Sequence, residues 1–281
     1  MFKAIIEFFQ TPMPSGNAPL PFGPFHLTLL ALSILTGVLL SVFFKNCSDK
    51  TYRRIVFISW LIILILEIYK QIDYSFHIQA DGSIKFDYQW YAFPFQFCSS
   101  PLYVWRILAF VKNKHVYDAT TAFSMTFTFF AGTAVMILGQ DIYINEIGIN
   151  LQTSIHHGLM LAIGALTVTR NRKRLGDYKF FLKGCIVFAI LLVIAIILNS
   201  LSQYWTTETF NMFYVNKKFG CHLPVLSLVE PHVPQVVFLI IYLLGFMLVA
   251  LIVHSLARGI YELVKLFIRI HKKRMQSKTA N

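Results

Sequence analysis

The chain has 281 residues, of which 56% are hydrophobic and only 14% are charged. Water-soluble domains usually carry about 25% charged residues, so this composition excludes a soluble protein. The net charge of +12 raises the question of nucleic acid. Nucleic-acid binding needs a basic face with groove-reading or stacking elements, and we find none, so we expect no nucleic-acid partner.

Seven apolar blocks follow one another along the chain, each long enough to cross a bilayer core of about 30 Å. They cover residues 26–44, 55–71, 89–111, 119–139, 151–169, 180–201 and 234–256. Each must be helical, because lipid offers no hydrogen-bonding partner to a free backbone group. The sequence predicts an all-α, polytopic transmembrane helical bundle of about seven spans, with an outer segment at 1–25, a membrane domain at 26–256 and a basic cytoplasmic tail at 257–281.

Basic residues gather in alternate connections, which predicts the orientation. Lysines and arginines concentrate between spans 1 and 2, 3 and 4, and 5 and 6, and after span 7. The other segments hold only Lys3, Lys70, Lys85, Lys217 and Lys218. Because basic loops stay in the cytoplasm, we expect the N-terminus outside and the C-terminus inside. Ordinary anchoring accounts for the basic tail, although its amphipathic character also suits anionic lipid.

The four cysteines are too few for a disulfide framework, and no pair has metal-ligand spacing. The predicted topology places Cys47 and Cys185 toward the cytoplasm. It places Cys98 in the outer half of the third span and Cys221 in the last outer loop, so only these two could meet. We expect neither a metal nor a cofactor, and the sequence leaves the oligomeric state open.

Polar side chains at membrane depth are costly and usually face a cavity. Once each span has a direction, the strongest polar groups fall in the outer third of five spans. This outer polar layer comprises Glu67, Lys70, Gln96, Asp141, His156, His157 and Asn199. The sequence therefore predicts one polar cavity open to the outer leaflet or to the extracellular face.

Helical spacing groups some of these residues on common faces. One face of the third span carries Gln96, Ser99, Ser100 and Tyr103, and one face of the fifth carries Asn150, Ser154 and His157. Glu67 and Lys70 are three residues apart and can form an ion pair. Pro101 would bend the middle of the third span. Serine hydroxyls often bond only their own helix, but two adjacent histidines at membrane depth are rare.

The segments FPFQFCSSPLY (93–103), SIHHGLML (154–161) and FNMFYVNKK (210–218), which includes Asn211, resemble the YwaF-type family of bacterial integral membrane proteins. That family is distantly similar to the eukaryotic transmembrane protein 164 acyltransferases. The resemblance implies a multi-pass protein of the bacterial plasma membrane whose partners are membrane lipids. The catalytic cysteine and its neighbouring histidine in the eukaryotic branch fall on Phe95 and Gln96 here, and the later histidine falls on His157. Cys98 matches a cysteine common in the bacterial branch.

One hypothesis is therefore a membrane-embedded acyltransferase or lipid hydrolase that acts on an outer-leaflet phospholipid or lipid-linked substrate. His157 would be the general base, because the ordinary pKa of histidine lies near neutral pH, and Ser154 or Asn150 would orient it. Cys98, a substrate hydroxyl or water would be the nucleophile. Gln96 and Ser99 would donate to the developing oxyanion.

The alternative hypothesis is a non-enzymatic small-solute transporter or binding protein with an outward-open polar cavity. Seven spans around an outer pocket fit this function equally well, because architecture alone does not decide function. A transporter needs polar residues that continue toward the cytoplasm, and the candidates are Thr121, Ser124, Thr128 and His254.

Overall fold

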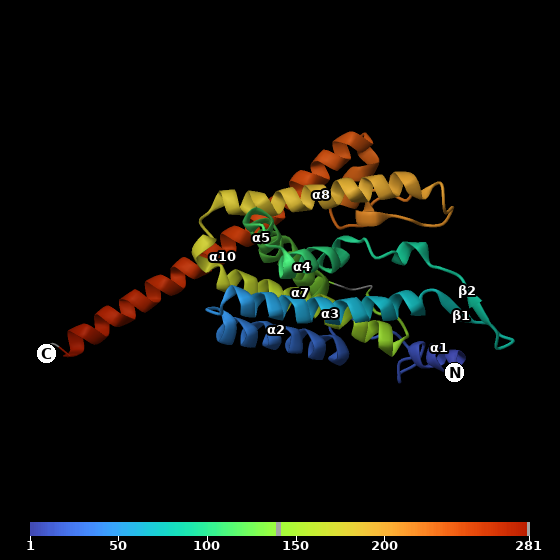
Figure 1. Cartoon of the computed structure of the whole chain (residues 1–281), viewed down its shortest axis with the longest axis horizontal. Helices are drawn as coiled ribbons and strands as arrows, with labels where there is room; N and C mark the ends of the chain where they lie inside the picture. Colours follow the sequence, from blue (N-terminus) through green and yellow to red (C-terminus); the bar gives the residue numbers. More distant parts are fainter. Residues whose placement is uncertain (139–141, 280–281) are drawn as a thin grey trace.

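The computed structural model of the chain describes residues 1–138 and 142–279. Four long helices run side by side along the long axis of the molecule (Figure 1). They are α2 (Pro24–Phe44), α3 (Asp49–Asp73), α7 (Ile147–Arg170) and α8 (Tyr178–Ser202). The last helix, α10 (Gln235–Thr279), crosses them obliquely and extends beyond their ends. Residues 257–279 of the predicted basic tail continue α10 without a break.

Five helices in the described ranges are long and apolar enough to cross a membrane. They are Pro24–Phe44, Asp49–Asp73, Lys114–Leu138, Tyr178–Ser202 and Gln235–His271. The third consists of α5 (Lys114–Phe123), a π-helical turn (Ser124–Thr128) and α6 (Phe129–Leu138). These five match predicted spans 1, 2, 4, 6 and 7, and the chain is a multi-pass membrane protein.

The prediction of one continuous helix over 89–111 is wrong. Two short 3₁₀ turns, η1 (Trp90–Ala92) and η2 (Phe97–Ser99), precede the helix α4 (Ser100–Phe110). At 1.5 Å per residue, α4 is about 16 Å long, roughly half of a bilayer core. Pro101 lies in its first turn, where a missing backbone N–H costs nothing, so this proline begins the helix and does not bend it. Gln96 lies before α4 and cannot share a helical face with Tyr103.

The segment of the fifth predicted span forms the 24-residue helix α7, which is not one of the five apolar helices. Its polar residues lower its hydropathy, and the bundle buries them. Close packing surrounds α7 with α2, α3 and α6. A Cβ atom on Gly132 of α6 would lie 2.6 Å from the backbone nitrogen of Leu161, so only glycine permits this approach. Small residues thus make α7 the centre of the bundle.

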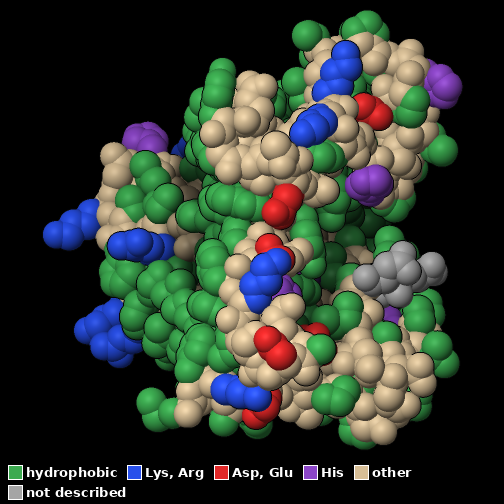
Figure 2. Space-filling model, turned by 90° about the vertical axis from the view of Figure 1, so that its right-hand side faces the viewer, with side chains coloured by type: hydrophobic (Ala, Val, Ile, Leu, Met, Phe, Trp, Pro, Cys, Tyr) green, Lys and Arg blue, Asp and Glu red, His purple; other side chains and the backbone are tan. Residues whose placement is uncertain are grey.

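Irregular segments gather at one end of the molecule, onto which Figure 2 looks, and acidic, basic and histidine side chains are interspersed there. The N-terminal segment forms α1 (Phe2–Phe9), which buries Ile6. A hairpin that we did not predict pairs β1 (Phe76–Ile78) with β2 (Ile84–Phe86). The other short elements at this end are η5 (Met212–Tyr214), α9 (Leu226–Val229) and η6 (Glu230–His232), whereas η4 (Arg172–Arg174) connects α7 to α8 at the opposite end.

Two large hydrophobic cores fill the bundle, and a smaller cluster of Ala122, Met125, Leu175 and Phe180 lies between α5, the π-helical turn and the start of α8. One joins α8 and α10 to the segment around η5, and the other joins α3, α4 and α7. Phe97 packs against both cores. The irregular segment 93–99 therefore lies between the two halves of the bundle and is held by each of them.

Candidate functional site

The two adjacent histidines lie near the first third of α7 and are almost completely buried. His156 is 3% exposed and His157 is 9% exposed, and their ring centres are 5.3 Å apart. His156 Nε2 lies 2.9 Å from the carbonyl oxygen of Cys98, in the irregular segment 93–99. His157 Nδ1 lies 2.7 Å from the carbonyl oxygen of Thr153, one turn earlier in α7. The pair therefore joins the central helix to the segment that carries Cys98.

These contacts determine which nitrogen of each ring carries the proton. A carbonyl oxygen only accepts hydrogen bonds, so the facing ring nitrogen must donate. In the neutral form, His157 then has an unprotonated Nε2 and His156 an unprotonated Nδ1. Neither atom has a hydrogen-bond partner in the described part of the chain. The site thus holds two buried basic nitrogens without donors, an arrangement that needs a specific explanation.

An ion pair on α3 lies beside the histidines. Lys70 Nζ is 2.7 Å from Glu67 Oε1, the i, i+3 pair that the sequence predicted. The other carboxylate oxygen of Glu67 has no partner within the described residues. Lys70 is within electrostatic range of His156 and His157. It also acts on the thiol of Cys98, as Glu67 does, so the structure brings these five predicted residues together.

A second layer of polar groups holds this ion pair in place. Gln71 Nε2 donates to Glu67 Oε1 at 2.7 Å and to the carbonyl oxygen of Ala92 at 2.8 Å. The hydroxyl of Tyr88 donates to Gln71 Oε1 at 2.8 Å. Burial raises the pKa of Tyr88 to about 12, so this hydroxyl remains a donor at neutral pH. Sequence reasoning missed Gln71 and Tyr88, although Gln71 lies one turn after Glu67.

The side-chain amide of Gln96 is engaged by backbone groups of a distant loop. Its Nε2 donates to the carbonyl oxygen of Asn211 at 2.9 Å, and its Oε1 accepts from the backbone N–H of Phe213 at 3.0 Å. Asn199 makes the same two-way contact with Met212, at 2.9 and 2.8 Å. Both amides therefore fix the segment around η5 against the bundle.

Asn211, which we placed in the cavity, is also engaged by the backbone. Its Nδ2 donates to the carbonyl oxygen of Gly220 at 2.7 Å, and its Oδ1 accepts from Asn216 N–H at 2.9 Å. The segment 210–218, the third of the segments that carry the resemblance, is thus a folded loop with its own amide network. Its role in the site is to cover segment 93–99.

The residues expected to orient His157 form hydrogen bonds elsewhere. Ser154 lies 3.2 Å from the hydroxyl of Tyr143, and Asn150 exchanges two hydrogen bonds with the backbone of Ile144. Both side chains therefore anchor the connection before α7, and the backbone carbonyl of Thr153 orients His157 in their place. Helical geometry explains this. The ring of His157 reaches the carbonyl oxygen of Thr153, four residues earlier, more easily than it reaches the side chain of Ser154, three residues earlier.

The remaining predicted residues lie at the start of α4 or outside the described residues. Ser99 and Ser100 are 3% and 1% exposed, and the hydroxyl of Ser100 has no partner within the described ranges. Tyr103 donates to the carbonyl oxygen of Pro94 at 2.6 Å, which closes the turn before α4. Asp141 falls among residues 139–141, outside the described residues.

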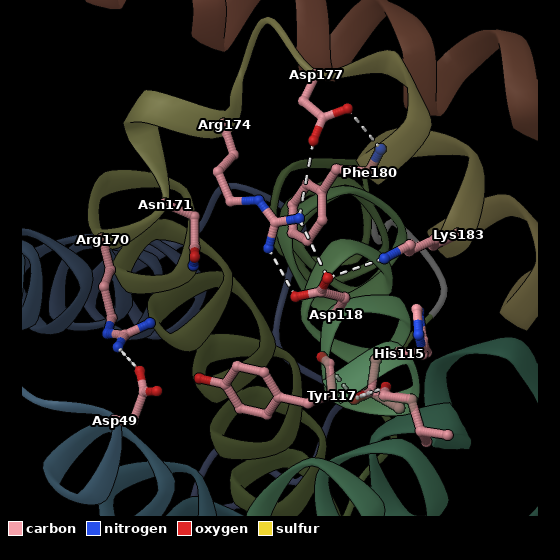
Figure 3. A network of polar contacts seen from close by, with 12 residues as sticks. Asp49, His115, Tyr117, Asp118, Arg170, Asn171, Arg174, Asp177, Phe180 and Lys183 are labelled. Carbon is pink, nitrogen blue, oxygen red and sulfur yellow. Dashed lines mark hydrogen bonds and ion pairs between the residues drawn. The ribbon is translucent and has the colours of Figure 1, made fainter. Parts of the chain in front are cut away.

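A second polar network, which we did not predict, lies at the opposite end of the bundle (Figure 3). Asp118 of α5 pairs with Arg174 at 2.7 Å and with Lys183 of α8 at 2.8 Å. Arg170 pairs with Asp49 at the start of α3. Asp49 and Asp118 each lie among basic residues in the sequence. This pattern could have predicted that they form ion pairs. These ion pairs link four helices, so some of the basic residues at this end stabilise the bundle.

Comparison with known proteins identifies the family. The model of the TMEM164 family matches residues 21–257, which include α2 through α8 and most of the membrane part of α10. No curated protein and no solved structure matches the chain.

Proposed function

Because this chain belongs to the TMEM164 family, we propose that it is a membrane-embedded acyltransferase or lipid hydrolase acting on an outer-leaflet phospholipid or lipid-linked substrate. The observation that carries the proposal is His157. Its Nδ1 is tied to the carbonyl oxygen of Thr153, and its Nε2 is buried, unprotonated and without a partner among the described residues. An imidazole held in one tautomer with a free basic nitrogen is suited to general-base catalysis.

In this proposal, His157 Nε2 takes a proton from the nucleophile. Where Cys98 is the nucleophile, its thiolate attacks the ester carbonyl and the ester C–O bond breaks. The departing lysolipid alkoxide takes the proton back from His157, and a thioester remains on Cys98. An acceptor hydroxyl or water, deprotonated by the same nitrogen, then attacks the thioester and releases the thiol. Without the thiol step, the acceptor hydroxyl attacks the lipid ester directly.

We assign oxyanion stabilisation to Lys70 and not to Gln96. The Lys70 ammonium acts electrostatically on Cys98 and on both histidines. A fixed cation near the reacting carbonyl stabilises the negative charge that develops on its oxygen. Glu67 holds Lys70 in position through the 2.7 Å ion pair, which makes Glu67 a positioning residue.

The proposed topology has seven crossings, with the N-terminus outside and the C-terminus inside. The 24 residues of α7 have the length of a span, and its polar groups are shielded by the surrounding helices. Segment 90–110 supplies the remaining crossing, since irregular backbone is tolerated at membrane depth where protein buries it. The YwaF-type segments further support a bacterial plasma-membrane protein with membrane lipids as its partners.

The test is acyl transfer in proteoliposomes that contain the full chain, a phospholipid labelled in its acyl chain and an unlabelled lysophospholipid. We expect His157→Ala to reduce transfer and hydrolysis about 10²-fold or more, the usual contribution of a general base. His115→Ala, which removes an exposed histidine of α5, is the matched control. Full activity of His157→Ala would exclude the mechanism. Loss of activity in Cys98→Ser would favour the thioester route over direct attack of the acceptor hydroxyl on the lipid ester.

One observation favours the transporter alternative. The π-helical turn at Ser124–Thr128 interrupts the α5–α6 span, and such turns are frequent at functional sites. The hydroxyls of Thr121 and Thr128 are buried beside it and have no partner in the described part of the chain. A solute path would use these groups. Solute flux in the same proteoliposomes that falls in Thr128→Val and persists in His157→Ala would favour transport over lipid chemistry.

A further inference from the structure

The last helix continues well beyond the bundle. With 45 residues at 1.5 Å each, α10 is about 68 Å long, more than twice the roughly 30 Å of a bilayer core. Ala257 and Tyr261 still pack, partly buried, against the small cluster that contains Leu175 and Phe180. Beyond Tyr261, α10 extends away from the other helices (Figure 1). Residues 262–271 therefore form a helical stretch whose side chains are exposed, apart from the partly exposed Lys265.

This stretch is amphipathic. Helical spacing aligns four exposed apolar side chains on one face, namely Ile260, Leu263, Phe267 and Ile270. The opposite face carries Arg258, Glu262, Lys265 and Arg269. A short helix without tertiary contacts is marginal in water, and an exposed apolar face rimmed by polar residues marks an interaction surface. The apolar face of the extension therefore requires a partner.

Charge distinguishes between the possible partners. Residues 257–281 contain seven basic residues and one acid, Glu262, whose Oε2 lies 2.9 Å from Lys265 Nζ. A second copy aligned in parallel would bring two such basic segments together, whereas an anionic bilayer would neutralise them. Ordinary positive-inside anchoring explains the basic residues but gives no role to the apolar face. A basic face opposite an apolar face is typical of a helix that lies in the membrane interface.

We infer that residues 262–271 bind the anionic phospholipid surface of the leaflet on the C-terminal side of the bundle. Leu263, Phe267 and Ile270 enter the acyl region, and Lys265 and Arg269 reach the phosphates. Because α10 crosses the other long helices obliquely, its extension inclines toward the membrane surface and does not follow the bundle axis (Figure 1). In the proposed orientation this is the cytoplasmic leaflet, whose surface is negatively charged.

This surface is separate from the proposed chemistry. Arg258 donates to the hydroxyl of Tyr178 at 3.3 Å, so α10 leaves the bundle beside the start of α8. The start of α8 lies at the end that carries the Asp118–Arg174 network, opposite the hairpin end (Figures 1 and 3). Binding here requires no turnover, so failure of the acyl-transfer proposal would leave the inference standing, and the reverse also holds.

The experiment measures hydrogen exchange by mass spectrometry in the full chain, held in nanodiscs of phosphatidylcholine or of phosphatidylcholine mixed with phosphatidylglycerol. We expect the amides of residues 262–271 to exchange about tenfold more slowly in the anionic discs, because docking suppresses local opening of the helix. High salt should remove much of this difference by screening. Residues 238–250, in the membrane-spanning part of α10, should exchange equally in both kinds of disc and provide the internal reference.

Variants of the two faces test their separate contributions. Phe267→Gln combined with Ile270→Gln removes apolar side chains but keeps good helix formers, so the slow exchange in anionic discs should be lost. Lys265→Gln combined with Arg269→Gln should reduce the tenfold difference between the discs to about twofold. The matched controls are Phe267→Leu and Arg54→Gln, which changes an exposed arginine of α3, and both should behave as the unmodified chain does.

Equal exchange of residues 262–271 in the two kinds of disc would overturn the inference. Slow exchange in both kinds that appears only in discs holding two chains would also overturn it, because the apolar face would then bind a second copy. Unchanged exchange of residues 238–250 verifies that each variant is folded.

Discussion

At the scale of single residues, the site depends on backbone carbonyls that select one protonated nitrogen on each histidine. The carbonyl oxygen of Thr153 accepts a hydrogen bond from Nδ1 of His157, and that of Cys98 accepts one from Nε2 of His156. No side chain within residues 1–138 and 142–279 hydrogen-bonds to these two ring nitrogens. The free basic nitrogens are a consequence of main-chain geometry, and this explains how polar side chains such as Ser154 can lie nearby and still have other roles.

A pair of carboxyl groups near the hairpin end makes stability depend on pH. Asp73 is 3% exposed, and its carboxyl group interacts electrostatically with that of Glu146, the residue before α7. Burial raises the pKa of Glu146 above its ordinary value of 4.5. The folded chain therefore keeps a proton that the unfolded chain releases. This contribution is fully present below pH 4.5 and is lost as the pH rises through the folded pKa.

We expect Glu146→Gln to raise the melting temperature at pH 7.5 by a few degrees and to flatten its decline between pH 4.5 and 7.5. The amide keeps the shape of the protonated acid and has no proton to lose. Thermal unfolding in detergent across this pH range is the measurement. Glu208→Gln, which changes an exposed carboxyl group, should leave the curve unchanged. An unaltered pH dependence in Glu146→Gln would show that another group is responsible.

At the scale of elements, amides hold the loop around η5 to segment 93–99. Gln96→Leu removes two hydrogen bonds and leaves the carbonyl oxygen of Asn211 and the N–H of Phe213 without partners. Each unsatisfied buried group costs about 1–3 kcal/mol. We expect faster hydrogen exchange in residues 210–216, measured by mass spectrometry. Gln203→Leu on the exposed end of α8 is the control, and equal protection in both variants would argue against this docking role.

Close packing of α6 against α7 also has a direct test. A Cβ atom on Gly132 would lie 2.8 Å from the carbonyl oxygen of His157, whereas one on Gly245 of α10 would meet nothing within 4 Å. Gly132→Ala should therefore cost about 1–3 kcal/mol through overpacking, and Gly245→Ala should be neutral or slightly stabilising. Denaturation in mixed micelles compares the two variants. An unchanged free energy of unfolding in Gly132→Ala would mean that α6 can move away from α7.

At the scale of the whole molecule, the two ends of the bundle differ in structure. One end carries α1, the β-hairpin and the loop with η5, and the other is tied by ion pairs between four helices (Figures 1 and 3). Ion pairs at the second end use several of the basic residues that predicted the orientation. Arginines and lysines at this end therefore stabilise the bundle in addition to directing its insertion.

The proposed orientation predicts the accessibility of single cysteines in a chain whose native cysteines are replaced by alanine or serine. Asp81→Cys in the hairpin should react with a membrane-impermeant maleimide in intact cells, because Asp81 is exposed at the outer end. Lys50→Cys at the start of α3 should react only after the cells are opened. The reverse pattern would invert the topology, and labelling of both in intact cells would contradict seven crossings.

The apolar blocks alone determined that the chain is a helical multi-pass membrane protein, because lipid leaves a long apolar segment no alternative to a helix. The ion pair between Glu67 and Lys70 was predicted from their i, i+3 spacing alone, and it is present. Only the tertiary structure decided where segment 89–111 stops being helical. The partners of Gln96 lie 115 and 117 residues away, and no local pattern encodes such hydrogen bonds. The contact between Glu67 and Lys70 was thus predictable from local spacing, whereas the contacts of Gln96 depend on the packing of distant segments.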